Sequence, residues 1–253
     1  MQEKFAYLRK NAYLCGQIKF MDDFFCRSEA LLGAEVMNAL RTKRVIIFGV
    51  GGVGSYAAEA LIRTGLTHLT IVDDDTVQPS NINRQLPATR ETLGMPKVEA
   101  LKERLLTINP EAEIVAISER YTPETSFNFQ LSTFNFIIDA IDSVNDKTDL
   151  IISATRARGV KVFSSMGAAL RFDPTQVTTG ELMDIKGDAL AKAVRARMKK
   201  IGQKTSRKVQ CVYSTEQAQQ CETRGSLMQV TAVFGCTLAA LVINAIRSSL
   251  KNQ

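Results

Sequence analysis

The chain has 253 residues, of which 45% are hydrophobic, so it is long enough and apolar enough to bury one sizeable core. It contains neither an internal repeat nor a low-complexity linker, which excludes repeat architectures and favours one domain over residues 1–253. Lys and Arg (32) outnumber Asp and Glu (26), and the net charge of +6 favours polyanionic partners. The five cysteines form no Cys-x-x-Cys pair, so we expect no structural zinc and a reducing compartment, the cytoplasm.

The order of the predicted elements indicates the fold. Residues 1–40 have helical patterning, and we expect this segment to pack on a neighbouring subunit. Residues 1–10 include no apolar stretch of signal-peptide length, which argues against secretion. Later strands alternate with helical patterns, which predicts an α/β fold with a doubly wound, mostly parallel sheet and an antiparallel return near the C-terminal end. The expected strands cover residues 45–49, 69–73, 113–118, 135–141, 160–165 and 209–213.

A glycine-rich turn follows the first expected strand, and residues 55–63 after the turn have helical composition. A helix that begins at such a turn offers unpaired N–H groups and the positive end of its dipole to a phosphate. Turns of this form occur in several classes of nucleotide-binding protein, and some only connect a strand to a helix. The glycines that we expect to contact a nucleotide are Gly49, Gly51, Gly52 and Gly54.

Acidic and then basic residues follow the second expected strand. The strand ends at Asp73, where the dinucleotide-binding fingerprint places an acid on a ribose hydroxyl. Arg84 and Lys97 come soon after, and two cations at this point suit a triphosphate, whose charge they can neutralise. A dehydrogenase or plain NAD-binding module stays open as an alternative. The residues expected to contact a nucleotide here are Asp73, Asp75, Asn81, Arg84, Gln85 and Lys97.

Two further acids lie at the end of the strand expected over residues 135–141. Asp139 and Asp142 would reach the carboxyl edge of the sheet, where open α/β sheets bind their ligands. Mg²⁺ prefers one or two carboxylates together with phosphate oxygens. We therefore expect Asp142 to hold Mg²⁺ beside the nucleotide.

Six motifs together resemble the ThiF/MoeB/HesA and ubiquitin-activating superfamily. They are Gly-x-Gly-Gly-x-Gly, Asp-x-Asp, Asn-x-x-Arg-Gln, Gly94-Met-Pro-Lys97, Ile108-Asn-Pro110 and Asp139-Ala-Ile-Asp142-Ser143. These enzymes adenylate a carboxylate with ATP. The resemblance implies a Rossmann-like adenylation domain with a nucleotide-binding half over residues 41–165 and a substrate and dimer half over residues 166–253.

The resemblance also implies roles for individual residues. Relatives insert an N-terminal arginine into the ATP site of a partner subunit, and Arg27 stands where that residue is expected, which implies a homodimer. The resemblance assigns the ribose to Asp73, the triphosphate and reacting carboxylate to Arg84, Gln85 and Lys97, and the magnesium ion to Asp142.

Three segments in the second half resemble one branch of this superfamily. They are residues 164–175, Gly187-Asp-Ala-Leu190 and Val212-Tyr-Ser-Thr-Glu216, and the branch is the TcdA (CsdL) group of tRNA threonylcarbamoyladenosine dehydratases. In that group ATP adenylates the carboxylate of a modified adenosine next to the anticodon. An attack within the same modification then displaces AMP, with net loss of water. An adenylating activator of a sulfur-carrier or ubiquitin-like protein stays open as an alternative.

The branch implies further partners besides tRNA. Relatives suggest a monovalent cation, sodium or potassium, and some members bind a cysteine desulfurase and its sulfur acceptor. Among the cysteines, Cys221 lies in a polar stretch, and we interpret it as an exposed thiol without a required role.

A basic stretch in the second half agrees with an RNA partner. Eight cations fall within residues 192–208 without one acid. Residues 188–201 have the pattern of a helix with Leu190, Val194 and Met198 on one face. Such a surface can follow an RNA backbone, although a solvated helix face is the alternative. We expect Phe172 and Tyr213 to pack inside the protein, so the sequence predicts no aromatic platform for bases.

The last long apolar segment, residues 227–246, has no charged residue and about the length of a membrane span. Polar residues and the central Gly235 interrupt it. We therefore expect a buried helix that packs against the sheet, and no membrane association.

Overall fold

The computed structural model of the chain describes residues 24–223 and 225–251. The expectations for residues 1–23, including the argument against a secretory leader, lie outside the described residues. Within the described residues, the helices α2 (Cys26–Leu32) and α3 (Ala34–Arg41) precede the first strand. Met37 and Leu40 of α3 are fully buried, which fixes this helix to the core.

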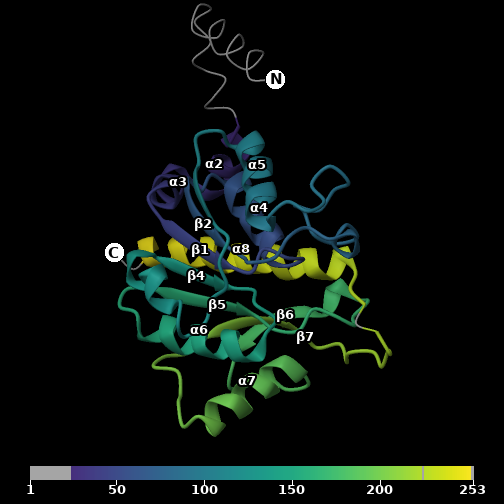
Figure 1. Cartoon of the computed structure of the whole chain (residues 1–253). Helices are drawn as coiled ribbons and strands as arrows, with labels where there is room; N and C mark the ends of the chain where they lie inside the picture. The colour runs from purple at the N-terminus through teal and green to yellow at the C-terminus, as the bar shows by residue number, and fades with distance from the viewer. Residues whose placement is uncertain (1–23, 224, 252–253) are drawn as a thin grey trace, which may run out of the picture.

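The centre of the molecule is a seven-stranded sheet with the order β3-β2-β1-β4-β5-β7-β6 (Figure 1). Neighbouring strands are parallel except at the β6–β7 edge, where they are antiparallel. This arrangement confirms the predicted doubly wound sheet and its antiparallel return. The strands are β1 (Arg44–Phe48), β2 (His68–Val72), β3 (Glu113–Ile117), β4 (Phe136–Asp139), β5 (Lys161–Ser165), β6 (Val177–Glu181) and β7 (Gln210–Ser214).

Helices cover both faces of the sheet (Figure 1). The α-helices that follow α3 are α4 (Gly54–Thr64), α5 (Lys97–Ile108), α6 (Val144–Arg156), α7 (Ala189–Lys200) and α8 (Met228–Lys251). The connections between the described strands and helices contain short 3-10 helices, η2 (Pro79–Asn81), η3 (Ser126–Phe129), η4 (Leu131–Thr133) and η5 (Pro174–Gln176).

The alternation of side chains along β1 divides the interior into two apolar layers. Val45 and Ile47 pack with residues of α4, α5 and α8, whereas Ile46 and Phe48 pack with residues of α6 and α7. Successive side chains of a strand point to opposite faces, so a strand that is apolar at every position must be covered on both sides. The continuous apolar run after Arg44 therefore determines the three-layer architecture.

Two strand predictions differ from the structure. The strand expected over residues 135–141 ends at Asp139, because the chain leaves the sheet there to form the loop before α6. The sequence did not predict the strand β6, because its residues Val-Thr-Thr-Gly-Glu contain no apolar run. The strand lies at the sheet edge and is only half-buried. An edge strand with one neighbour needs less apolar surface than a central strand, so periodicity does not reveal it.

The helix α8 is long and apolar enough to cross a membrane by length and composition alone. One side of it, however, is part of the core: Val230, Phe234, Leu238 and Val242 recur at helical spacing and are fully buried. A Cβ atom at Gly235 would come within 2.6 Å of Cβ of Tyr56 on α4, so the missing side chain permits close contact of the two helices. The buried face supports the expectation of a core helix.

Candidate functional site

A cleft with a volume of about 520 Å³ lies beyond the carboxyl ends of β1 and β4. After β1 the chain continues to β2 on one side, whereas β4 lies on the other side, so the strand order reverses at this point. Open α/β sheets bind ligands at such a switch point. Nine residues predicted from the sequence line the cleft: Gly49, Gly51, Gly52, Asp73, Asp75, Arg84, Gln85, Lys97 and Asp142.

The glycine-rich turn connects β1 to α4 at the floor of the cleft. Gly49 has a φ of 84°, and a Cβ atom there would lie 2.8 Å from the carbonyl oxygen of Ala140 in the neighbouring loop. Gly54 does not line the cleft, and its Cβ atom would overlap the carbonyl oxygen of Gly49. These two glycines therefore permit the turn itself, whereas Gly51 and Gly52 face the cleft.

Asp73 is held at the edge of the turn by backbone donors. Its carboxylate accepts hydrogen bonds from the N–H of Val50 at 2.8 Å and from the N–H of Asp75 at 3.0 Å. Burial raises the pKa of Asp73, while the nearby Lys97 and the backbone N–H groups act in the opposite direction. The amine of Lys97 lies 2.6 Å from Oδ2 of Asp75 and 4.0 Å from Oδ1 of Asp73.

The segment after β2 also brings Arg84 and Gln85 to the cleft. The guanidinium of Arg84 donates to the carbonyl oxygen of Ser80 at 2.9 Å. Gln85 is buried, and its Oε1 has no hydrogen-bond partner among the described residues. A Cβ atom at Gly51 would lie 3.5 Å from Nε2 of Gln85, so this amide lies beside the glycine turn.

Asn81 does not line the cleft and instead stabilises a local turn. Its Oδ1 accepts the backbone N–H of Gln78 at 2.9 Å. The pair forms a capping box around η2. Because Arg84 and Gln85 both donate their backbone N–H groups to the carbonyl oxygen of Asn81, this residue holds the turn that carries them.

The two acids after β4 separate in the structure. Asp142 is exposed and lines the cleft. Asp139 is fully buried and forms an ion pair of 2.6 Å with Lys147, while Ser164 donates to the same carboxylate oxygen. Its other oxygen accepts the N–H of Ile141. Asp139 therefore fixes the start of the loop that presents Asp142, and it does not reach the cleft surface.

Sequence reasoning did not identify Arg120 and Asp146. Both line the cleft, and two nitrogens of Arg120 donate to Oδ2 of Asp146 at 2.9 and 2.6 Å. Asp146 stands three residues after the N-cap Ser143, in the first turn of α6, where acids are common. That position was the available signal for Asp146, whereas Arg120 stands in a loop without a pattern.

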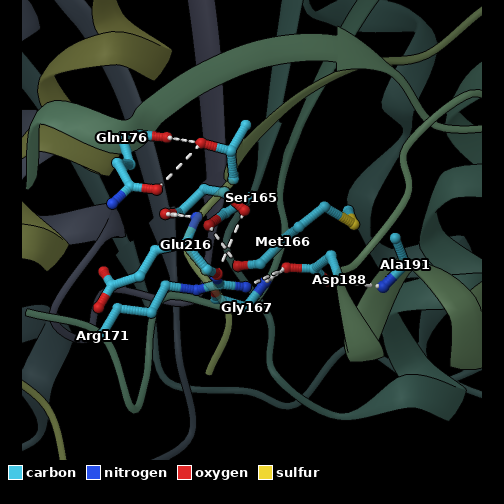
Figure 2. Close-up of polar contacts among 10 residues, drawn as sticks. Ser165, Met166, Gly167, Arg171, Gln176, Asp188, Ala191 and Glu216 are labelled. Carbon is cyan, nitrogen blue, oxygen red and sulfur yellow. Dashed lines mark hydrogen bonds and ion pairs between the residues drawn. The ribbon is translucent and has the colours of Figure 1, made fainter. Parts of the chain in front are cut away.

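A buried ion pair joins the cleft wall to α7 (Figure 2). Asp188 lies 2.9 Å from Arg171, and both side chains are almost completely buried. Asp188 also accepts the N–H of Gly167 at 3.2 Å and caps α7 through the N–H of Ala191 at 2.9 Å. Arg171 further donates to the carbonyl oxygen of Glu216. The sequence motifs marked this region, but their spacing did not reveal the pair.

Two other predictions concern residues outside the cleft. Arg27 is exposed on α2 and does not line the cleft of its own chain. The prediction that Phe172 packs inside was wrong, because its side chain is 62% exposed. The backbone N–H of Phe172 donates to the carboxylate of Glu216 at 3.0 Å, so its main chain is anchored while its side chain faces solvent. Tyr213 packs against Gly180 in the interior, as predicted.

Known proteins share this fold and these motifs. The profile described as ThiF family matches residues 25–253. The tRNA threonylcarbamoyladenosine dehydratase of Bacillus subtilis (strain 168) is 40% identical over 192 residues, which are 76% of this chain and 74% of that protein. The structure of E. coli TcdA in complex with ATP has a TM-score of 0.85 at 32% identity and covers 91% of this chain and 96% of that chain. The molybdopterin-synthase adenylyltransferase of Salmonella typhimurium is 32% identical over 139 residues, 55% of this chain and 54% of that protein.

Proposed function

Because the chain belongs to the ThiF family, we propose that it is an ATP-dependent dehydratase that cyclises threonylcarbamoyladenosine in tRNA. The observation that carries the proposal is the cleft at the switch point, where a glycine turn, a buried ribose acid and two cations meet. The tRNA threonylcarbamoyladenosine dehydratase of Bacillus subtilis matches 76% of this chain, whereas the molybdopterin-synthase adenylyltransferase of Salmonella typhimurium matches 55%. ATP is then a substrate, and AMP and pyrophosphate are products.

The part of the cleft that the first half of the chain forms would bind ATP. The N–H groups at the start of α4 and the positive end of its dipole favour a phosphate at Gly51 and Gly52. The carboxylate of Asp73 is already ordered by two backbone donors and is suited to accept a ribose hydroxyl. The unpaired Oε1 of Gln85 supports a further polar contact to the ligand.

Arg84 and Lys97 would stabilise the charge that develops during adenylation. A carboxylate oxygen of the modified adenosine attacks the α-phosphorus, and the bond to the leaving pyrophosphate breaks. A nucleophile in the same modification then attacks the activated carbonyl carbon and expels AMP, which carries away the carboxylate oxygen. The nucleoside loses one water overall. Fixed cations near the reacting phosphate lower the barrier because they require little reorganisation.

The donor set near Asp142 fits Mg²⁺. Its carboxylate is exposed in the cleft and has no ion pair among the described residues, so it is available as a hard oxygen ligand. The carboxylates of Asp73, Asp74 and Asp75 also lie within 4.8 Å of one another, but Asp73 is engaged by backbone donors and Asp75 by Lys97. We assign Mg²⁺ to Asp142, where the ion would neutralise phosphate charge. The monovalent cation stays a prediction without assigned ligands.

We propose that the enzyme is a cytoplasmic homodimer. Arg27 is exposed and far in sequence from the cleft residues, which supports a contribution to the ATP site of a partner subunit. Four cysteines are free among the described residues, which suits a reducing compartment. Binding of a cysteine desulfurase and its sulfur acceptor also stays a prediction.

Mass spectrometry of nucleosides tests the function directly. Purified protein, Mg-ATP and threonylcarbamoylated tRNA should give a nucleoside lighter by one water, with one AMP per product. Arg84→Ala should abolish both products. Arg90→Ala is the matched control, because this arginine is exposed in the same connection but does not line the cleft. An unchanged nucleoside with the wild-type protein would reject the proposal, and pyrophosphate exchange that requires a small sulfur-carrier protein would favour the alternative activator function.

A further inference from the structure

Helix α7 begins at the cleft and extends away from it. Gly187 and Asp188, directly before the helix, and Leu190 in its first turn line the cleft. A helix of 12 residues is about 18 Å long, so its last turn lies well beyond the nucleotide site. Figure 1 shows α7 at the outer side of the molecule, beyond α6. A ligand that fills the cleft and continues along this side would meet α7 over its whole length.

One face of α7 packs inside the protein and another faces solvent. Ala191, Val194 and Met198 are buried, and they pack in the apolar layer that also contains residues of α6. Lys192 and Lys199 are both exposed and stand seven positions apart, which places them on the same face of the helix. The burial pattern therefore orients a row of lysines toward solvent.

Only two cations in this region are neutralised by acids among the described residues. Arg197 pairs with Asp149 at 2.8 Å, and Lys208 lies 3.7 Å from Glu181. The exposed fraction of the Lys208 side chain is 89%, so this second pair is weak. The basic stretch thus keeps most of its positive charge in the folded protein.

Other arginines of the region bind neutral oxygens and keep their charge. Arg195 donates to the carbonyl oxygen of Leu182 at 2.8 Å. Arg207 donates to the carbonyl oxygen of Ala154 at 3.1 Å, at the end of α6. These bonds hold the two guanidinium groups in place and leave their positive charges uncompensated.

The end of α6 adds cations to the same surface. Arg156 reaches Gln203 in the loop after α7 at 3.3 Å, so the two segments lie together. We call the exposed cations of these segments that have no acidic partner in the described part of the chain the α7 ridge. Its members are Arg156, Arg158, Lys192, Lys199, Lys200, Lys204 and Arg207.

We infer that the α7 ridge binds the sugar-phosphate backbone of the tRNA stem that continues from the modified adenosine in the cleft. The inference rests on the proposed function: with ATP at Gly51 and Gly52, the modified adenosine would occupy the rest of the cleft, which the first turn of α7 also lines. Uncompensated like charges repel one another, and phosphates relieve that repulsion while they release their own counterions. Contacts of this kind position an RNA without reading its sequence.

The composition of the exposed face favours RNA over an anionic membrane surface. Between Lys192 and Lys199 the outward positions include Ala196, which has too little apolar surface to enter a lipid boundary. Interfacial helices bind membranes through large apolar side chains such as Trp, Phe and Leu opposite their cations. On α7 the face opposite the lysines is already buried in the protein.

The test compares two substrates that share the modified loop, of which only one carries the stem and the rest of the tRNA. One is full-length threonylcarbamoylated tRNA, and the other is the isolated anticodon loop with the same modification. Replacement of four lysines by glutamine should raise the KM for full-length tRNA on the order of tenfold to a hundredfold and leave the loop substrate unchanged. The ridge variant carries Lys192→Gln, Lys199→Gln, Lys200→Gln and Lys204→Gln.

A control variant should remove equal charge from other surfaces without changing either KM. Its positions lie on α3, α5, α8 and the residue before β1, and none has an acidic partner among the described residues. The control variant carries Arg41→Gln, Lys43→Gln, Lys102→Gln and Lys251→Gln.

Binding of unmodified tRNA separates this inference from the proposed function, because it requires no catalysis. The logarithm of the association constant should fall with the logarithm of salt concentration, and the slope of the ridge variant should be smaller by about 0.7 to 0.9 for each lost phosphate contact. Equal binding by the wild-type and ridge proteins would overturn the inference, and so would an equal loss with both substrates. Binding to anionic vesicles that the ridge substitutions abolish, with tRNA binding intact, would also overturn it. A wild-type protein that binds tRNA through the ridge but dehydrates neither substrate would reject the proposed function alone.

Discussion

The amine of Lys97 lies 2.6 Å from Oδ2 of Asp75, and the two side chains differ sharply in exposure, at 7% for Lys97 and 65% for Asp75. A buried cation thus has an exposed carboxylate as its partner at the mouth of the cleft. Phosphate oxygens that enter the cleft can replace this carboxylate without moving the lysine. The pair therefore holds the amine ready for a polyanionic ligand.

Substitution Lys97→Ala should reduce kcat/KM for adenylation about 10²- to 10³-fold, because a fixed charge next to the reacting phosphate is lost. Formation of AMP in the presence of modified tRNA measures the effect. Lys102→Ala, on the same helix but outside the cleft, serves as the control and should retain the wild-type rate. Equal rates for both variants would exclude a role of Lys97 in the reaction.

Two glycines of the turn should respond differently to alanine. Gly49→Ala should lower the free energy of unfolding by about 3 kcal/mol, because the backbone has positive φ and the new Cβ atom approaches the carbonyl oxygen of Ala140. Gly51→Ala should keep the stability of the wild type, since its Cβ atom meets Gln85 at an ordinary 3.5 Å. It should nevertheless lose the rise in Tm that Mg-ATP causes. Urea unfolding and thermal shifts measure the two effects, and a destabilised Gly51→Ala would contradict this division.

The raised pKa of Asp73 predicts how ATP binding depends on pH. Burial favours the neutral carboxyl group, so the folded protein binds this proton more tightly than the unfolded chain. The contribution of Asp73 to stability is therefore present below the unfolded pKa and is lost as the pH rises through the folded pKa. The ribose contact requires the ionised form. We expect ATP affinity to fall in acid at a higher pH than for an ordinary aspartate near 3.9.

Calorimetric titration with ATP from about pH 7 to about pH 4 measures how ATP affinity falls in acid. Asp73→Asn should bind ATP more weakly at neutral pH, and its affinity should not show the part of this fall that protonation of Asp73 causes. Protonation of ATP itself affects both proteins equally, so the difference between them reports Asp73. Identical pH profiles would show that Asp73 does not contact the nucleotide.

Breaking the buried pair of Arg171 and Asp188 should destabilise the fold. Asp188→Ala should cost about 3–5 kcal/mol, because it leaves a buried guanidinium without its charge partner. The double variant Arg171→Met with Asp188→Ala should recover part of this loss, since no buried charge remains. Asp149→Ala, in the partly exposed pair with Arg197, should cost about 1 kcal/mol or less. Chemical denaturation tests the order, and equal losses at both pairs would contradict it.

The sequence alone indicated six of the seven strands and the chemical character of the cleft. The apolar run after Arg44 implied a strand buried on both faces, the glycines implied a turn at its end, and the cations after Asp73 implied a polyphosphate ligand. These features depend on neighbours within a few residues, where backbone geometry and side-chain spacing are local properties. The likeness of the six motifs to one superfamily then connected the cleft with adenylation.

Only the tertiary structure decided which polar residues meet. Asp139 and Asp142 stand three positions apart, yet one is enclosed with Lys147 and the other opens into the cleft. Arg171 pairs with Asp188 across a strand and two loops, and Arg197 in the basic stretch pairs with Asp149 of α6, whereas the α7 ridge keeps no acidic partner among the described residues. Such contacts join residues distant in the chain, and their geometry follows from how the layers pack rather than from local spacing.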